Sequence, residues 1–263
     1  MRSLPIYSAH SLDTIPNFIP HLTFLLLHMA TSAELINPSV TRLGWIGTGL
    51  MGRSMCAHLI NAGYTLTVFN RTLSKAQPLV DMGARLAQTP HDLAAQSDIV
   101  FSIVAYPSDV SLVLLDPTTG ALSGLRPGGI LVDMTTSEPS LAVEISAAAS
   151  SKNCSLIDAP VSGGVRGAKN GTLAIFAGGD EAVVNRPVHE LANQITITST
   201  MVGLVEGIVY SHKAGMNVAS FLDAISTGAA GSKSLDLHGS RILKRDFEPG
   251  FFVNHFVKDL GIC

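Results

Sequence analysis

Charged side chains are scarce in this chain. Only 14% of its 263 residues are Asp, Glu, Lys or Arg, whereas an average globular protein has about 25%. With a formal net charge of −3 and a pI near 6.3, the composition gives no sign of a surface that would bind nucleic acid or an anionic membrane. Glycine, by contrast, is abundant at 24 residues. Few charges with many glycines are typical of buried parallel strands joined by tight turns.

Cysteine is rare as well. The three cysteines, Cys56, Cys154 and Cys263, are odd in number and widely spaced. This pattern predicts reduced thiols rather than a disulfide framework, and it suggests no metal cluster.

Residues 1–41 have no long apolar run. Their apolar run at 24–27 is too short for the core of a secretory signal, which needs about 7–15 residues. Acids are few, as in a mitochondrial presequence, but Arg2 is the only Lys or Arg and such presequences are Arg-rich. Two interpretations stay open: a targeting peptide, or a disordered extension in which Met29 is an equally suitable start. The predicted location is therefore mitochondrial or cytoplasmic.

From residue 42 onward the sequence carries a dinucleotide-binding pattern. An apolar strand at 43–46 leads into Gly47-x-Gly49-x-x-Gly52, which is followed by a helical run and a second strand ending at Phe69. In this strand–turn–helix context the glycines allow a tight turn and close approach of a pyrophosphate, which the helix N-terminus then holds. The predicted cofactor-binding residues in this loop are Gly47, Gly49, Leu50, Met51 and Gly52.

The end of the second predicted strand indicates which dinucleotide is bound. An NAD enzyme usually has Asp or Glu there, but this chain has Asn70-Arg71-Thr72. A guanidinium pairs with a 2′-phosphate, whereas a carboxylate would repel it. The sequence therefore favours NADP, with NAD as the alternative cofactor, and it adds Asn70, Arg71 and Thr72 to the predicted cofactor site. The competing interpretation is that Arg71 is a solvated loop residue.

Further strands alternate with helical runs along the chain. Strands are predicted at 99–104 and 130–133, in "CSLIDAPVSGG" and in "GTLAIFAGG". This alternation predicts an α/β fold with a doubly wound parallel sheet. Ligands bind beyond the carboxyl ends of such strands, where Tyr106, Pro107, Thr135, Thr136 and Ser137 fall.

Seven motifs in order resemble one family, the β-hydroxyacid dehydrogenases, and in particular the plant 3-hydroxyisobutyrate dehydrogenase-like proteins. They are "GWIGTGLMG", "VFNRT", "DMTTSEP", "DAPVSGG", "GTLAIFAGG", "LANQ" and "FVKDLG". The resemblance runs from about Arg42 to the end of the chain. It implies a Rossmann-type domain followed by an all-helical domain, and hydride transfer between NADP or NAD and a short hydroxyacid or its semialdehyde.

The resemblance also assigns roles to individual residues. Thr136 and Lys258 match cofactor-binding positions. The predicted catalytic residues are those that match the substrate motif and the active-site asparagine: Ser162, Gly163, Gly164 and Asn193. Consecutive backbone N–H groups with a hydroxyl form an anion nest, which suits a substrate carboxylate. Asn193 and Gln194 would otherwise be explained as the start of a helix.

The family's acid–base lysine is not found in this chain. In the family it stands three residues before the asparagine, within Gly-x-Gly-x-x-x-Lys-x-x-Asn, but Glu190 occupies that position here. The helix, strand and loops that the family places before it need roughly 25 residues, and only residues 187–190 bridge the two ends. The resemblance therefore predicts an internal deletion. It also predicts a C-terminal truncation, because family members continue beyond "FVKDLG".

These observations predict three segments: an extension at 1–41, an NADP-binding Rossmann domain at 42–190 without its last strand, and a truncated helical domain at 191–263. The predicted function is that of an NADP-dependent oxidoreductase acting on a small carboxylate. The alternative is a catalytically impaired NADP-binding isoform that lacks the lysine. No metal, nucleic-acid or membrane partner is expected. Helices with apolar surface on several sides suggest a homo-oligomer.

Overall fold

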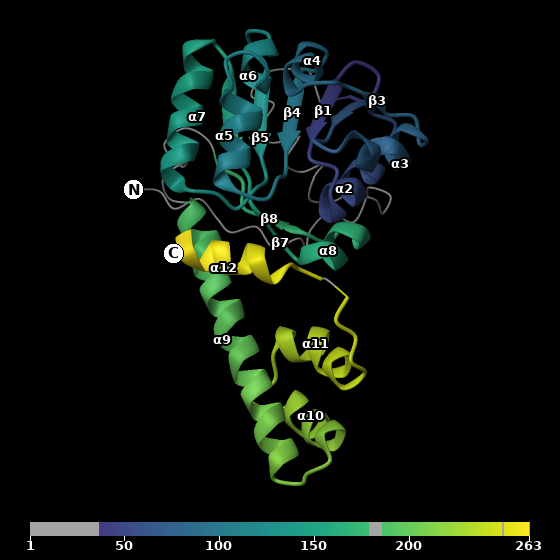
Figure 1. Cartoon of the computed structure of the whole chain (residues 1–263), viewed down its shortest axis with the longest axis vertical. Helices are drawn as coiled ribbons and strands as arrows, with labels where there is room; N and C mark the ends of the chain where they lie inside the picture. Colours follow the sequence, from purple (N-terminus) through teal and green to yellow (C-terminus); the bar gives the residue numbers. More distant parts are fainter. Residues whose placement is uncertain (1–36, 179–185, 249, 263) are drawn as a thin grey trace.

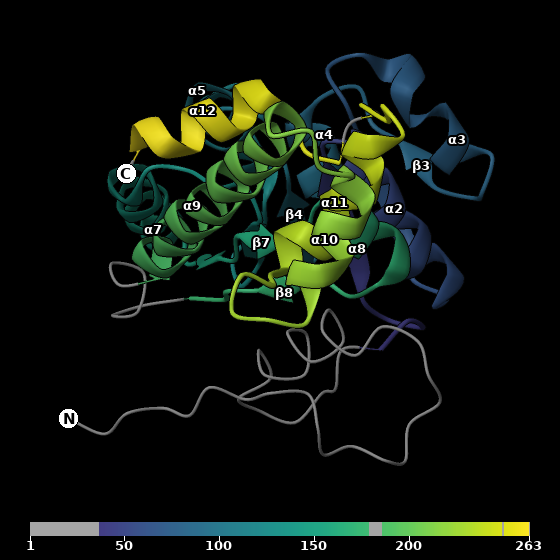
Figure 2. The same cartoon turned by 90° about the horizontal axis from the view of Figure 1, so that it is seen from below.

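The computed structural model describes residues 37–178, 186–248 and 250–262. An α/β domain forms the upper part of the molecule in Figure 1, and a long helix leads from it to a small helical lobe below. The chain then returns, so that its last described helix lies back against the α/β domain (Figures 1 and 2). The predicted Rossmann-type sheet followed by helices is therefore confirmed.

The central sheet has six parallel strands in the order β3-β2-β1-β4-β5-β6. Their bounds are β1 Arg42–Ile46, β2 Thr65–Phe69, β3 Arg85–Leu86, β4 Ile99–Ser102, β5 Ile130–Asp133 and β6 Ser155–Asp158. The order reverses direction beside β1, so the carboxyl ends of β1 and β4 open a crevice for a ligand.

Two details of the sheet differ from the prediction. The short strand β3 was not expected. The strand predicted at 99–104 ends at Ser102, because the amide of Val104 donates to the side chain of Thr135 at 3.0 Å and no longer follows the ladder.

Helices cover both faces of the sheet, as a doubly wound fold requires. The helices α2 Leu50–Asn61, α3 Gln77–Val80 and α8 Gly164–Asn170, with the 3₁₀ turn Leu73–Ala76, pack on one face. On the other face are α4 Pro90–Ala95, α5 Pro107–Leu115, α6 Ala121–Gly124 and α7 Pro139–Ser151. Side chains alternate along β1: Leu43 and Trp45 join the first core, and Ile46 joins the second.

A two-stranded antiparallel ribbon lies beside the main sheet. It pairs β7 Val161–Ser162 with β8 Ala174–Ile175. The predicted strand in "GTLAIFAGG" is therefore only two residues long and does not join the parallel sheet. Beyond it, Gly178 and Asp158 exchange backbone hydrogen bonds of 2.8 and 2.6 Å, so the chain still runs along the edge of β6.

The C-terminal part is helical: α9 Arg186–Lys213, α10 Val218–Ser226, α11 Lys233–Leu243 and α12 Val253–Ile262. Leu204, Leu222 and Leu235 form the small core that joins α9, α10 and α11. The long helix begins five residues before the predicted start at 191, so the predicted domain boundary after residue 190 falls inside α9. Among the described helices, α9 included, none has both the length and the apolar character needed to cross a bilayer.

Candidate cofactor and substrate site

The loop between β1 and α2 is shaped by two glycines that admit no side chain. Gly47 has a φ of 96°, and a Cβ there would lie 2.1 Å from the carbonyl oxygen of Ile103. A Cβ on Gly52 would lie 2.0 Å from the carbonyl oxygen of Gly47. Because neither glycine has a side chain, α2 can pack close to β1 with its N-terminus directed at the crevice.

Gly49 differs from its two neighbours, because a Cβ built there would meet no atom within 4 Å. The space in front of Gly49 is therefore open, and the first amides of α2 border it with the positive end of the helix dipole. Beside it, the buried hydroxyl of Thr48 finds no hydrogen-bond partner among the described residues. An open cradle with unused donors fits the pyrophosphate of a dinucleotide.

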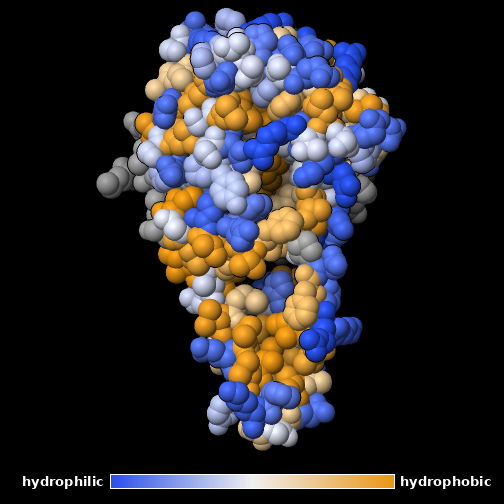
Figure 3. Space-filling model, in the orientation of Figure 1, coloured by the Kyte–Doolittle hydropathy of each residue, from blue (hydrophilic) through white to orange (hydrophobic). Residues whose placement is uncertain are grey.

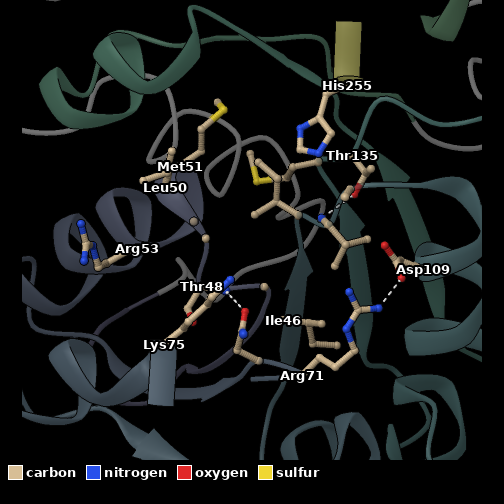
Figure 4. Close-up of a pocket in the computed structure, with 18 of the residues that line it drawn as sticks. Ile46, Thr48, Leu50, Met51, Arg53, Arg71, Lys75, Asp109, Thr135 and His255 are labelled. Atoms are coloured by element: carbon tan, nitrogen blue, oxygen red, sulfur yellow. Dashed lines mark hydrogen bonds and ion pairs between the residues drawn. The ribbon is translucent and has the colours of Figure 1, made fainter. Parts of the chain in front are cut away.

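The cradle belongs to a cavity of about 870 Å³. Glycine-loop residues line one side of it, residues after the ends of β2 and β5 line others, and α12 contributes His255, which lies at the opposite side in Figure 4. All ten residues predicted to bind the cofactor line this cavity: Gly47, Gly49, Leu50, Met51, Gly52, Asn70, Arg71, Thr72, Thr136 and Lys258. The structure therefore brings together residues from four separate segments of the chain.

The Asn70-Arg71-Thr72 segment forms one end of the cavity. The side chain of Asn70 accepts from the amide of Thr48 at 3.0 Å and donates to the carbonyl oxygen of Thr72 at 3.0 Å, so it ties the glycine loop to the end of β2. Arg71 reaches across the opening to Asp109, which the sequence analysis did not identify (Figure 4). A signal was present, because Asp109 stands in the first turn of a helix that follows a strand end.

The predicted anion nest adjoins the cavity in sequence, although its own residues Ser162, Gly163, Gly164 and Asn193 are not among those that line it. Gly163 and Gly164 have φ values of 127° and 56°, which favour glycine and turn the backbone sharply at the start of α8. Asn193 from α9 donates to the hydroxyl of Ser162 at 3.2 Å. The predicted catalytic residues are thus neighbours, although they come from β7, α8 and α9. Val161 and Val165, on either side of the nest, line the cavity.

Helix α12 carries Lys258 to the end of β5. The Lys258 ammonium donates to the carbonyl oxygen of Thr136 at 2.5 Å and pairs with Asp259 at 2.7 Å. Asp259 is buried, and its other oxygen accepts from the side chain of Gln194 at 2.5 Å. Gln194 therefore anchors α12 to α9, a role that the sequence analysis missed because the two residues are 65 positions apart.

His255 also lines the cavity and was not predicted. It stands one turn before Lys258 on α12, and its ring packs edge-on against Tyr106, Phe251 and Phe252. Partial burial, and then the charge of Lys258, lower the pKa of His255. The imidazole is therefore biased toward its neutral form.

Two buried carboxyl groups lie beneath the site, at neighbouring positions of β5 and β6. Burial raises the pKa of Asp133 to about 6, although Ser102 and Thr135 hydrogen-bond to it. Burial, and then the charge of Asp133, raise the pKa of Asp158 to about 7. One oxygen of Asp158 has no hydrogen-bond partner among the described residues, so this carboxyl group is held largely in its protonated form below neutral pH.

Glu190, at the family's lysine position, lies within α9, and its side chain is outside the described part of the chain. So is Cys263, whereas Cys56 and Cys154 are free, buried thiols, as predicted for reduced cysteines. Lys213, another basic group of α9, is 23 positions beyond Glu190 and cannot reach the nest. Among the described residues that line the cavity together with Val161 and Val165, helix α12 contributes the titratable groups of Lys258 and His255.

Comparison with known proteins identifies the family. Residues 42–203 match the NAD binding domain of 6-phosphogluconate dehydrogenase, and residues 188–263 match the NAD-binding domain of NADP-dependent 3-hydroxyisobutyrate dehydrogenase. The chain belongs to the 3-hydroxyisobutyrate dehydrogenase-like family. It is therefore an NAD(P)-dependent oxidoreductase by family, and its cavity has the features that such a cofactor needs.

Individual relatives agree with this assignment. The chain is 66% identical to the probable 3-hydroxyisobutyrate dehydrogenase-like 1, mitochondrial, of Arabidopsis thaliana, over 91% of this chain and 79% of that protein. Among solved structures, Psf3 in complex with NADP+ and 2-OPP is 25% identical with a TM-score of 0.79, covering 84% of this chain and 85% of Psf3. A Mycobacterium tuberculosis 3-hydroxyisobutyrate dehydrogenase with L-serine is 25% identical with a TM-score of 0.72, covering 84% of each chain.

Proposed function

We propose that this chain transfers a hydride between NADP and a short β-hydroxyacid or its semialdehyde. The observation that carries the proposal is the cavity, in which the glycine loop, the Arg71 segment and Lys258 border one space. The hydrogen-bonded Ser162–Asn193 pair lies next to it, because Val161, beside Ser162 in the sequence, lines the cavity. The bound dinucleotide supplies or accepts the hydride. The residues of the chain bind it, orient the substrate and handle the proton.

Arg71 is the basis for proposing NADP rather than NAD. Its guanidinium follows β2, where NAD enzymes carry a carboxylate, and Lys75 lines the same end of the cavity. We expect Arg71→Ala to weaken NADPH at least tenfold more than NADH, because only NADPH offers a phosphate for the charge-assisted hydrogen bonds that are lost. Titration by quenching of protein fluorescence measures both affinities. Equal losses for the two cofactors would contradict the NADP assignment.

The nest is the basis for proposing a carboxylate substrate. Ser162 offers a hydroxyl, Gly163 and Gly164 offer backbone amides, and Asn193 positions the hydroxyl through its 3.2 Å hydrogen bond. We expect Ser162→Ala to raise KM for the acid more than it changes the affinity for NADPH. In this proposal the nest binds the carboxylate, and the apolar side chains of Val161 and Val165 contact the carbon atoms of the substrate. Two small side chains suit a substrate with few carbon atoms.

The proposed reaction also needs a proton donor. Reduction of an aldehyde adds a hydride to carbon and a proton to oxygen, so a general acid or an oxyanion donor is needed. The family uses a lysine at the position of Glu190. This substitution favours a second candidate function: an NADP-binding isoform with impaired catalysis.

One set of assays separates the two functions. The purified chain is mixed with NADPH and either glyoxylate or succinic semialdehyde, and the absorbance of NADPH is followed. Turnover that falls in Glu190→Ala supports the first function and makes Glu190 the acid. Tight NADPH binding without turnover, unchanged by Glu190→Ala, would establish the impaired isoform. Turnover gained when the internal segment of the family is restored together with its lysine would show that the loss of this segment limits the chain.

We also propose that the chain assembles into a homo-oligomer through α9. Apolar surface gathers over the lower lobe in Figure 3. Ile195, Val202, Val205 and Val209 recur on one face of α9 at helical spacing and are 42–51% exposed. A second copy would bury this stripe. Light scattering should report a dimer or larger species that Val205→Glu disrupts, and a monomeric parent chain would refute the proposal.

The cellular location is proposed to be mitochondrial, since the Arabidopsis thaliana relative carries that location in its name. A fluorescent protein fused after residues 1–41 tests whether this segment directs import, and diffuse fluorescence in the cytoplasm would contradict it. For the division of the chain, we propose that the Rossmann domain ends, and the helical domain begins, within α9.

A further inference from the structure

One ion pair crosses the cofactor cavity. Nη1 of Arg71 donates to Oδ1 of Asp109 at 2.9 Å. Arg71 follows β2, and Asp109 lies in the first turn of α5, the helix after β4. Since β1 stands between β2 and β4 in the sheet, the pair joins the two walls of the crevice beyond the glycine loop (Figure 4).

The two partners are held very differently. The Arg71 side chain is 81% exposed, whereas that of Asp109 is 19% exposed and fixed on a helix. The N-terminal turn of α5 favours a carboxylate, because the helix dipole is positive there. Asp109 is thus the fixed partner, and Arg71 is the flexible one that extends toward it.

The charges around the pair make Asp109 unusual. Among the described residues that line the cavity, the cations Arg53, Arg71, Lys75 and Lys258 outnumber the carboxylates Asp109 and Asp259, so the cavity has an excess of positive charge. The other lining carboxylate, Asp259, is on α12 and already pairs with Lys258. Asp109 is therefore the carboxylate that faces the group proposed to bind the 2′-phosphate.

We infer that Asp109 sets cofactor selectivity by competing with the 2′-phosphate of NADP for Arg71. This inference rests on the proposed NADP function. A phosphate group carries about −1.5 to −2 charges at pH 7 and pairs best with a guanidinium that presents two N–H groups. Here one terminal nitrogen of Arg71 already serves Asp109, and the fixed carboxylate repels an arriving phosphate. NADH carries no 2′-phosphate and leaves the ion pair intact. Asp109 thus narrows the preference for NADP and lets the site accept both cofactors.

The test is Asp109→Asn, which removes the charge and keeps the shape. NADPH should bind roughly tenfold more tightly at low ionic strength, as expected from losing one negative charge a few ångströms from the phosphate. The affinity for NADH should stay within about twofold. The gain for NADPH should shrink as salt is raised, since the charges lie at a solvent-exposed opening. The thermal midpoint of the cofactor-free chain serves as a check on folding.

Asp223→Asn is the matched control. It makes the same change of charge at an exposed position of α10, outside the cavity, and should alter neither affinity. An Asp109→Asn variant that binds NADPH more weakly would overturn the inference, because Asp109 would then act by holding Arg71 ready for the phosphate. Equal changes for both cofactors would overturn it as well.

Arg71→Ala separates this inference from the proposed function. A selective loss of NADPH in Arg71→Ala, with no gain in Asp109→Asn, would overturn only the role of Asp109. Equal weakening of NADPH and NADH in Arg71→Ala would instead refute the assignment of Arg71 to the 2′-phosphate.

Discussion

The buried carboxyl group of Asp158 should make the stability of this chain fall as the pH rises. Asp158 is 5% exposed, and burial beside Asp133 raises its pKa from 3.8 to about 7. The folded state therefore binds more protons than the unfolded chain between these two pH values. Stability that is present at low pH is lost progressively as the pH rises through the pKa of the folded state.

The size of the effect follows from the shift. Below the pKa of the folded state, each pH unit lowers the free energy of unfolding by about 1.4 kcal/mol for one group. From pH 5 to the pKa of about 7, Asp158 therefore accounts for a loss of about 3 kcal/mol, and little more is lost between pH 7 and pH 8. Asp158→Asn replaces the carboxyl group with a neutral one of the same shape. Its free energy of unfolding should therefore decrease by about 3 kcal/mol less than that of the parent over this range.

Urea unfolding at pH 5, 6, 7 and 8 measures this difference. Asp223→Asn, an exposed change on α10, is the control and should follow the parent at every pH. If the parent and Asp158→Asn lost stability in parallel, the carboxyl group would be ionised without cost, and the argument from its burial would be wrong.

Two further predictions concern the glycine loop and the anchor of α12. Gly49→Ala should leave the thermal midpoint nearly unchanged, since its Cβ meets no atom within 4 Å, yet it should weaken NADPH binding at least tenfold. Gly52→Ala should instead lower the free energy of unfolding by about 3 kcal/mol, because its Cβ would lie 2.0 Å from the Gly47 oxygen. Equal effects of the two changes would contradict the assignment. Gln194→Leu removes the donor to buried Asp259 and should cost about 2 kcal/mol. Faster amide hydrogen exchange in α12 should report this loss, with Ser199→Ala on α9 as the unaffected control, and unchanged exchange would show that Gln194 does not hold α12.

The parts predicted well from sequence are those with local causes. The glycine loop could be placed because Gly47, Gly49 and Gly52 each meet a demand of one strand–turn–helix unit. The strand at 130–133 was predicted with its observed bounds because the apolar residues 130–132 are followed by Asp133 and a polar loop. Nine of the ten predicted cofactor residues then converge on one cavity because parallel strands bring their carboxyl ends to one edge, and the tenth, Lys258, arrives there on α12.

The parts that escaped prediction depend on distant pairing. Arg71 and Asp109 are 38 positions apart, and Gln194 and Asp259 are 65 apart. The local sequence around Asp109 indicates a residue near a strand end, but it does not indicate that Arg71 is its partner. The early start of α9 has a local explanation that was overlooked. Pro187 stands in the first turn, where its missing N–H would have had no helical partner. The two-residue strand β3 follows a tight turn at Gly83, with a φ of 106°, and is too short to give a periodic pattern.

The return of α12 has a consequence for how the chain folds and unfolds. Lys258 contacts Thr136 across 122 positions, after the chain has left the sheet and built the helical lobe. During synthesis from the N-terminus, the sheet and its glycine loop can form before Lys258 and Asp259, the hydrogen-bond partner of Gln194, have been added to the chain. A nascent or partly unfolded chain would thus present the phosphate cradle without its cover. Damage to the small core of Leu204, Leu222 and Leu235 would open the cleft from a distance, with every residue of the glycine loop still in place.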